Sequence, residues 1–311
     1  MAILCAENPS LHDTLTNYNV DLLWHPSLST ATPRELEATI ERICAGEQEL
    51  TVLCVEGAIA LGPDGTGMFD SMFGEAKMDI IKRLADRAQF VIAMGTCAAF
   101  GGVSAAGCNP TDSVGLQFRQ SDPGGLLDPS WRSAGGLPVI NVAGCPAHPS
   151  SMVRTLVAAL LGAPVELDPL NRPAEFFSTT VHRGCTRNEY HEYNVEEKAF
   201  GGDGCLFINL GCQGPTTQAI CNTELWNGES SKTRAGAPCI GCTAPNFPKP
   251  QNLLVTLKVG PIPLSLPLGV KRAKYMAYKG LARDAAPERL QPTAPQAKTA
   301  ATATAEEVDN G

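Results

Sequence analysis

The sequence predicts an α/β protein in which a doubly wound parallel sheet is followed by an irregular, metal-binding domain. Two observations carry this prediction. Up to about residue 165, unbroken apolar runs alternate with amphipathic segments, a pattern typical of parallel sheets covered by helices. From His182 to Cys242, six of the 12 cysteines are grouped with short spacers and few regular apolar runs. A chain of 311 residues is long enough for about two domains.

The N-terminal region is expected to alternate between helix and strand. Residues 2–18 are predicted to be mostly helical, with an interruption at Pro9, and NVDLLWH at 19–25 to form a short strand. A helix is predicted over 33–46, because a proline stands near its start and a glycine near its end.

Three apolar runs are expected to form strands buried on both faces, at 50–58, 90–97 and 137–145. Helices are predicted between and after them, over 77–88 and 149–162. This alternation implies a parallel sheet, whose functional site lies at the carboxyl ends of the strands.

Three strand ends carry reactive side chains. Glu56, Cys97 and Cys145 each stand near the carboxyl end of a predicted strand, so we expect the two thiols to face one crevice. Four further cysteines lack such a position, and we expect them to be ordinary buried thiols: Cys5, Cys44, Cys54 and Cys108.

The cysteine-rich segment predicts metal ligation. A disulfide framework fits poorly, because no secretory segment is visible and the chain is far larger than a disulfide mini-domain. The soft ligands number seven, more than one tetrahedral zinc ion needs, and they divide into a four-ligand and a three-ligand iron–sulfur site. Two zinc sites with one ligand missing remain the alternative. The seven are His182, Cys185, Cys205, Cys212, Cys221, Cys239 and Cys242.

The remaining segments suggest a division into residues 1–165, 166–268 and 269–311. Residues 166–177 are proline-rich and are predicted to link the two domains. KRAKYMAYKGLA at 271–282 predicts a short basic helix, and the composition of 286–311 predicts a disordered tail.

Charge and hydropathy exclude several classes of function. The net charge of −8 argues against binding to nucleic acid or to an anionic membrane surface. No apolar run approaches the roughly 20 residues of a membrane span, and no basic segment precedes an apolar one at the start. Twelve cysteines without a disulfide framework fit a reducing compartment, so we expect a cytoplasmic location, free or peripheral to the inner face of the membrane.

An ordered set of motifs between about residues 50 and 247 resembles the small subunit of [NiFe]-hydrogenases. The match covers most of the chain and is most similar to the uptake type, often called group 2, and to the related H2-sensing type. The motifs are VEGAIALGPDGTG, MGTCAAFGG, NVAGCPAHPS, HRGC, CLFINLGCQGP and APCIGCTAPNFP.

The resemblance implies a flavodoxin-like domain with a proximal cluster, followed by a domain with medial and distal clusters. By position, Cys97 and Cys145 correspond to proximal ligands, and Glu56 to a family residue near that cluster. The family's distal ligands correspond to His182, Cys185, Cys205 and Cys212, and its medial ligands to Cys221, Cys239 and Cys242. Because three thiolates leave one iron of a cubane without a ligand, we expect a [3Fe–4S] medial cluster and a [4Fe–4S] distal cluster.

The resemblance also implies partners. The nickel–iron centre belongs to a separate large subunit, and the small subunit passes electrons from H2 to an acceptor protein or a quinone. Higher oligomers of the heterodimer are a further expectation.

One departure concerns the family's first strand and the CxxC turn after it, which supply two proximal ligands. This chain begins at the following helix, and only Cys5 could substitute. In a flavodoxin-like sheet that strand is internal, so its loss leaves neighbouring strands with unpaired backbone groups.

Three other functions compete with electron transfer in a hydrogenase. An H2 sensor that signals to a regulatory partner would share every motif. The cluster subunit of respiratory complex I would explain only the N-terminal half. A zinc-stabilised binding module is the last alternative.

Overall fold

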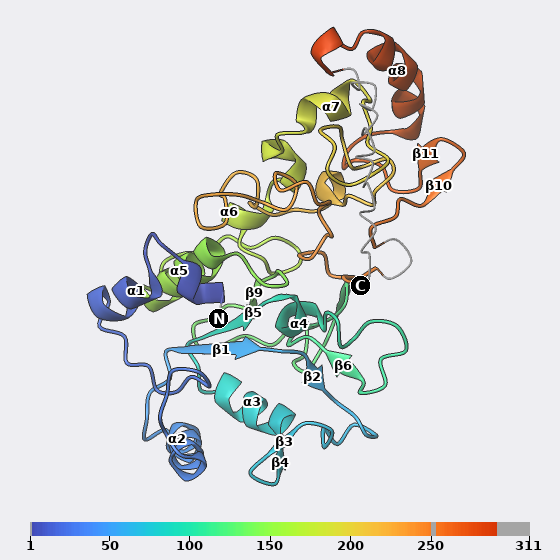
Figure 1. The fold of residues 1–311 in the computed structure, drawn as a ribbon. Coiled ribbons are helices and arrows are strands. Elements are labelled where there is room, and N and C mark those ends of the chain that lie inside the picture. The colour runs from blue at the N-terminus through green and yellow to red at the C-terminus, as the bar shows by residue number, and fades with distance from the viewer. Residues whose placement is uncertain (1, 250–252, 291–311) are drawn as a thin grey trace, which may run out of the picture.

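The computed structural model describes residues 2–249 and 253–290, and its two ends differ in character (Figure 1). One end contains the main sheet and most of the longer helices. The other consists mainly of irregular loops with short helical turns, one small hairpin and one longer helix, α8 (Arg272–Asp284). Among the helices of these described residues, none combines the length and the apolar character that a membrane span requires.

The main sheet has three parallel strands, which confirms the predicted α/β class. Their order is β1 (Val52–Glu56), β5 (Phe90–Met94) and β9 (Ile140–Val142). Between β1 and β5, Val52 lies opposite Phe90, and between β5 and β9, Met94 lies opposite Val142. Parallel neighbours align the carboxyl ends of all three strands on one edge of the sheet.

The two faces of this sheet are covered by different helices. On one face Val91 and Ala93 pack in a core with Met78 of α3 (Lys77–Ala85). On the other, Ile92 packs in a second core with Met152 of α5 (Pro149–Leu160). This two-sided burial explains why β5 contains an unbroken apolar run.

The predicted helix at 33–46 is confirmed as α2 (Pro33–Ala45), which packs beside α3. Thr32 and Glu35 form a reciprocal capping box at its start, and Gly46 adopts the left-handed conformation at its end. The helical prediction for 2–18 holds in two pieces, η1 (Ala2–Cys5) and α1 (Leu11–Asn17), on either side of Pro9.

Two strand predictions were wrong in part or in full. Residues 19–25 are not a strand, because they have no ladder partner in the described structure. The strand at 50–58 exists as β1, but only Val55 of its five residues is buried. The reason is that β1 lies at the edge of the sheet and pairs only with β5.

The long loop between β5 and β9 contributes to the core through short local elements. The first is α4 (Thr96–Phe100), which follows β5 directly and buries Phe100. Within this loop β6 (Ser113–Val114) pairs antiparallel with β2 (Ile59–Ala60), which lies before β5, and β7 (Phe118–Arg119) pairs with β8 (Asp122–Pro123). A further antiparallel pair, β3 (Ser71–Met72) with β4 (Glu75–Ala76), lies in the segment between β1 and α3.

The predicted link at 166–177 is packed rather than free. Its end forms α6 (Ala174–Phe177), and both Phe176 and Phe177 join the sheet-side core together with Ile220. Arg172 is 4 % exposed and forms an ion pair with Asp168 at 2.7 Å. The division of the chain at 165/166 stays a prediction.

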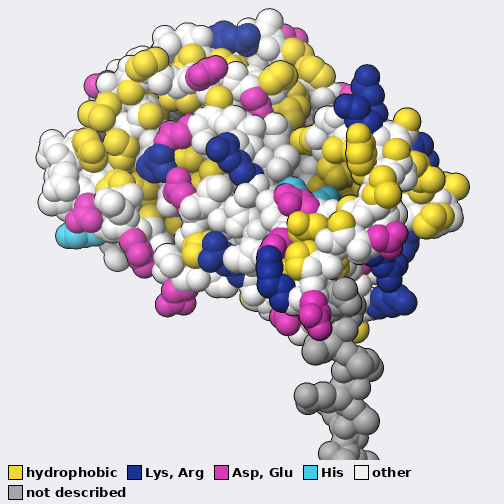
Figure 2. Space-filling model, turned by 90° about the horizontal axis from the view of Figure 1, so that it is seen from above, with side chains coloured by type: hydrophobic (Ala, Val, Ile, Leu, Met, Phe, Trp, Pro, Cys, Tyr) yellow, Lys and Arg dark blue, Asp and Glu magenta, His cyan; other side chains and the backbone are white. Residues whose placement is uncertain are grey.

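The irregular end contains η2 (Val181–Gly184), α7 (Asn188–Glu192), η3 (Gly214–Thr216) and a hairpin of β10 (Lys258–Val259) and β11 (Ile262–Pro263). The predicted basic helix is confirmed as α8 (Arg272–Asp284). Figure 2 views this end and shows Lys and Arg side chains among hydrophobic ones. The last described turn is η5 (Glu288–Leu290), and residues 291–311 of the predicted tail lie outside the described residues.

Candidate functional site

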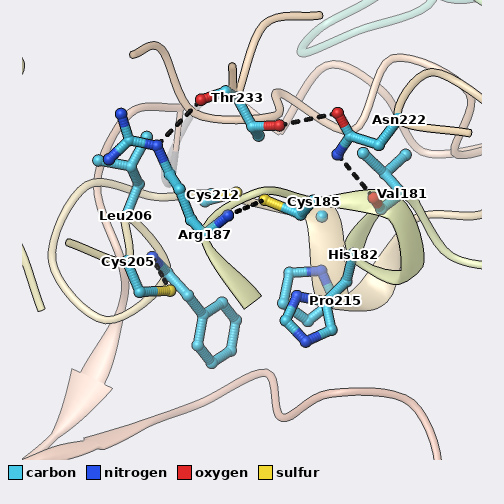
Figure 3. Close-up of a pocket in the computed structure, with 12 residues that line it drawn as sticks. Val181, His182, Cys185, Arg187, Cys205, Leu206, Cys212, Pro215, Asn222 and Thr233 are labelled. Atoms are coloured by element: carbon cyan, nitrogen blue, oxygen red, sulfur yellow. Dashed lines mark hydrogen bonds between the residues drawn. The ribbon is translucent and has the colours of Figure 1, made fainter. Parts of the chain in front are cut away.

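A pocket in the irregular end brings four predicted ligands together. Its lining includes His182, Cys185, Cys205 and Cys212 (Figure 3). These residues come from two segments that lie 20 residues or more apart in the chain. The structure therefore assembles around one hollow the set that the sequence predicted as one site.

Arg187 connects the two segments of this pocket. Its guanidinium donates from Nη1 to the carbonyl oxygens of Gly202 and Gly204, at 2.6 and 2.7 Å, and from Nε to the carbonyl of Thr233 at 2.9 Å. The planar guanidinium is suited to holding several acceptors in a fixed arrangement. It fixes the loop before Cys205 relative to the turn that contains Cys185.

Asn222 positions the turn that contains His182. Its Nδ2 donates to the carbonyl of Val181 at 2.7 Å, and its Oδ1 accepts from Thr233 Oγ1 at 3.0 Å. The two segments approach closely at Gly184, where a Cβ atom would lie 2.3 Å from the Asn222 carbonyl oxygen. Glycine is therefore required in HRGC by packing.

Backbone amides already point at two of the sulfur atoms. The N–H of Arg187 donates to Cys185 Sγ and the N–H of Phe207 donates to Cys205 Sγ, both at 3.4 Å (Figure 3). Hydrogen bonds of this kind stabilise thiolate sulfur and are among the factors that set the potential of iron–sulfur clusters.

Burial controls protonation in this pocket. It raises the pKa of Cys205 to about 12, raises the pKa of Cys212 and lowers the pKa of His182. At neutral pH the free side chains are therefore a pair of thiols and a neutral imidazole. A bound metal cluster would reverse the thiol preference, because cationic iron stabilises thiolate.

The three predicted medial ligands lie between this pocket and the sheet. Cys221 and Cys242 line a second pocket. Cys239 lies toward the first pocket, since a Cβ atom on Gly214 would be 3.4 Å from Cys212 Sγ and 3.8 Å from Cys239 Cβ. Burial raises the pKa of both Cys221 and Cys239.

His148 lines the same second pocket, and the sequence analysis did not identify it. Its ring is 7 % exposed, neither ring nitrogen has a hydrogen-bond partner, and it packs edge-on against Trp226 at 5.0 Å. A buried polar group without a protein partner is usually satisfied by a bound water, ion or cofactor. Together with soft thiol donors around both pockets, His148 fits a bound inorganic cluster. The only signal in the sequence is its place in NVAGCPAHPS, just before the proline that begins α5.

The two predicted proximal ligands lie at the carboxyl edge of the sheet. Cys97 was predicted to be the last residue of a strand, but β5 ends at Met94 and Cys97 lies in α4; Cys145 follows β9. Burial, and then repulsion from the thiols of Cys97 and Cys242, raise the pKa of Cys145. The segments of Cys97 and Cys145 are adjacent, because the Thr96 N–H donates to the Gly144 carbonyl at 2.9 Å. Cys97 is packed against Gly102, where a Cβ atom would lie 2.6 Å from its Sγ.

Thr96 joins this edge to the medial ligands. Its Oγ1 accepts from the Gly144 N–H at 2.8 Å and donates to the carbonyl of Cys242. Thr96 is 1 % exposed; its bond from the Gly144 N–H is buried, and its bond to the Cys242 carbonyl is partly buried.

Other predicted residues are exposed. Glu56 ends β1 as expected, but its side chain is exposed rather than buried. The expectation of buried thiols was wrong for Cys5, Cys54 and Cys108, which lie in a terminal turn, on the edge strand and in a loop. Cys44 is half-buried.

In the described part of the chain, no three His, Cys, Asp or Glu side chains converge as the site of a single metal ion. Metal analysis of the protein is the measurement that distinguishes bound zinc from bound iron–sulfur clusters.

Comparisons with known proteins match both parts of the chain. The family of C-terminal regions of the NiFe/NiFeSe hydrogenase small subunit matches residues 177–255, and the family described as "NADH ubiquinone oxidoreductase, 20 Kd subunit" matches residues 1–159.

Two curated relatives are similar over most of the chain. The F420 non-reducing hydrogenase II small subunit of Methanosarcina mazei is 34 % identical over 271 residues, which cover 79 % of this chain and 69 % of the relative. The periplasmic [NiFe] hydrogenase small subunit 1 of Nitratidesulfovibrio vulgaris is 32 % identical, with coverage of 79 % and 74 %.

Two solved structures share the fold. A chain of the actinobacterial-type NiFe-hydrogenase from Ralstonia eutropha H16 has a TM-score of 0.71 at 29 % identity, covering 91 % of this chain and 85 % of that one. A chain of the Ni-Fe-Se hydrogenase from Desulfomicrobium baculatum has a TM-score of 0.70 at 30 % identity, with coverage of 81 % and 93 %.

Proposed function

Because the chain belongs to the family of [NiFe]-hydrogenase small subunits, we propose that it relays electrons released by H2 oxidation. The electrons come from a nickel–iron centre in a separate large subunit and leave to an acceptor protein or a quinone. The chain itself contains no group proposed to activate H2. Its role is to hold a series of one-electron carriers at short, fixed separations.

The observation that carries this proposal is the continuity of the predicted ligand groups. Cys212 of the first pocket and Cys239 are both in contact distance of the Gly214 position, and the Gln213 N–H donates to the Cys239 carbonyl at 2.7 Å. At the other end, Thr96 joins the Cys242 carbonyl to the turn before Cys145. Three groups of sulfur ligands thus follow one another from the sheet edge to the irregular end.

We assign the groups as three cluster sites. Iron–sulfur clusters supply, when bound, the capacity to accept and release single electrons. His182, Cys185, Cys205 and Cys212 would hold a distal [4Fe–4S] cluster, and Cys221, Cys239 and Cys242 a medial [3Fe–4S] cluster, because three thiolates complete a three-iron unit. Cys97 and Cys145 would be two of the ligands of a proximal cluster.

The large subunit is expected at the sheet edge. Val103 is 55 % exposed there and follows Gly102, which touches Cys97. An exposed apolar side chain next to a predicted cluster ligand is consistent with a surface that a partner covers. Higher oligomers of the heterodimer and a cytoplasmic location stay predictions; two of the relatives are named periplasmic.

The test is anaerobic purification of the chain together with its large subunit. We expect iron and acid-labile sulfide without stoichiometric zinc, and steady H2-dependent reduction of an artificial dye. Zinc in place of iron would overturn the proposal. Iron–sulfur clusters with a very low dye-reduction rate, and a stable complex with a kinase, would favour the H2-sensing alternative instead.

A further inference from the structure

A second histidine lies beside the predicted distal cluster site. His191, on the single turn α7, has its Nδ1 3.4 Å from Cys205 Sγ, which is within the range of an N–H···S hydrogen bond. The pocket is lined by His182 but not by His191. His191 therefore touches a predicted ligand from behind rather than facing the space where a cluster would lie.

The imidazole ring of His191 is held in place by its neighbours. It packs edge-on against the His182 ring, with centroids 4.6 Å apart, and against the Phe207 ring at 5.4 Å. Its backbone N–H donates to the Arg187 carbonyl at 3.1 Å, and Arg187 is itself anchored to Gly202 and Gly204. The contact with Cys205 is thus fixed by packing on two sides and by the backbone.

The contact with Cys205 determines which nitrogen of His191 must carry a hydrogen. An imidazole can carry its N–H on either ring nitrogen. An iron-bound thiolate has no proton and can only accept, so a favourable contact with Cys205 Sγ requires the hydrogen on Nδ1.

We propose that His191 is a positioning residue that donates its Nδ1–H to the sulfur of Cys205 and thereby raises the reduction potential of the distal cluster. The proposal rests on the proposed function, since it requires a cluster at this site. A donor to a ligand sulfur withdraws negative charge from the cluster. Because the reduced cluster carries one more negative charge than the oxidised one, the donor stabilises the reduced form more.

The Phe207 N–H donates to the same sulfur at 3.4 Å, so Cys205 would have two donors. Of the two, only the one from His191 belongs to a side chain, and it can therefore be removed by substitution while the backbone donor remains.

The test is an EPR-monitored redox titration of the assembled, anaerobically purified complex. His191→Phe removes the donor but keeps an aromatic ring against Phe207. His191→Asn places an amide N–H near the position of Nδ1. Phe207→Leu is the matched control, because it loosens the ring packing and leaves both donors to Cys205 in place. We expect a lower distal midpoint potential for His191→Phe, recovery toward the wild-type value for His191→Asn, and no shift for Phe207→Leu.

Three outcomes would overturn the inference. An unchanged potential in His191→Phe would show that the contact donates no significant hydrogen bond. An equal downward shift in Phe207→Leu would assign the effect to packing or water access. Loss of distal iron and sulfide in His191→Phe would make His191 a ligand rather than a donor. The wild-type complex separates these results from failure of the proposed function, because a wild-type protein without distal iron and sulfide refutes the function itself.

Discussion

Replacing Thr96 by valine should destabilise the junction between the sheet edge and the medial ligands. Valine has nearly the same shape as threonine and removes only the hydroxyl. That hydroxyl accepts a hydrogen bond from the Gly144 N–H and donates one to the Cys242 carbonyl. Both partners belong to segments that contain predicted cluster ligands.

The expected magnitude follows from the two groups that lose their partner. Each buried amide or carbonyl left without a hydrogen bond costs about 1–3 kcal/mol, and the Gly144 N–H lies in a buried bond whereas the Cys242 carbonyl is partly buried. Because the partly buried carbonyl can regain part of this energy by bonding to water, the expected total is about 2–4 kcal/mol. Thr96→Ser keeps both hydrogen bonds and loses one methyl group, which costs about 1 kcal/mol.

The measurement is urea-induced unfolding of the complex under anaerobic conditions, monitored by the loss of the visible absorption of the clusters. We expect the midpoint to fall in the order wild type, Thr96→Ser, Thr96→Val. A midpoint for Thr96→Val equal to that of Thr96→Ser would show that the hydroxyl does not stabilise this junction. A midpoint for Thr96→Ser as low as that of Thr96→Val would assign the effect to the methyl group.

Three further predictions concern a buried ion pair, the type of the medial cluster and the solubility of the chain. Arg172→Met should lower the unfolding free energy by about 2–4 kcal/mol, because it removes the ion pair with Asp168 and leaves Gln218 Oε1 without its buried guanidinium donor. The half-exposed Arg154, mutated to Met, should cost less than about 1 kcal/mol in the same urea titration. Cys239→Ser should abolish or distort the EPR signal of an oxidised [3Fe–4S] centre and leave the distal cluster intact. A wild-type complex without that signal would contradict the three-iron assignment, and His148 would then be the candidate for a fourth ligand. The chain expressed without its partner should be poorly soluble, and a monodisperse monomer that melts cooperatively would count against a covered apolar face.

The parallel sheet and its site edge could be predicted from the sequence because both depend on local patterns. The apolar runs at β5 and β9 are buried on two faces, so their composition alone identifies them. Cys97 and Cys145 follow those strands directly, and parallel strands bring their carboxyl ends to one edge. The predicted strand at 19–25 contains apolar residues but has no partner in the described sheet, and composition does not reveal pairing.

The residues that the sequence could not predict make their contacts over long separations. His148 meets Trp226 across 78 residues of chain, and Thr96 bonds to the Cys242 carbonyl across 146 residues. In the irregular end no periodic pattern tells which loops will meet, because side-chain contacts and not regular ladders determine their paths. His191 is closer in sequence to Cys205, yet only the turn of α7 brings its ring to the sulfur.

The packing of the irregular end suggests why its loops need the proposed clusters to fold. Its hydrophobic core contains Cys205, Cys212 and Cys239 as members, alongside Leu206 and Phe207. The sulfur ligands thus take positions that in an ordinary domain would belong to aliphatic side chains. A cluster bound by such residues links segments that share no strand pairing, and its binding energy becomes folding energy. On this argument, removing iron should disorder the loops around the first pocket while β1, β5 and β9 keep their pairing, since the sheet is held by its own hydrogen bonds and by α3 and α5. Hydrogen exchange of the complex before and after chelation would decide this: equal loss of protection in the sheet and the loops would refute it.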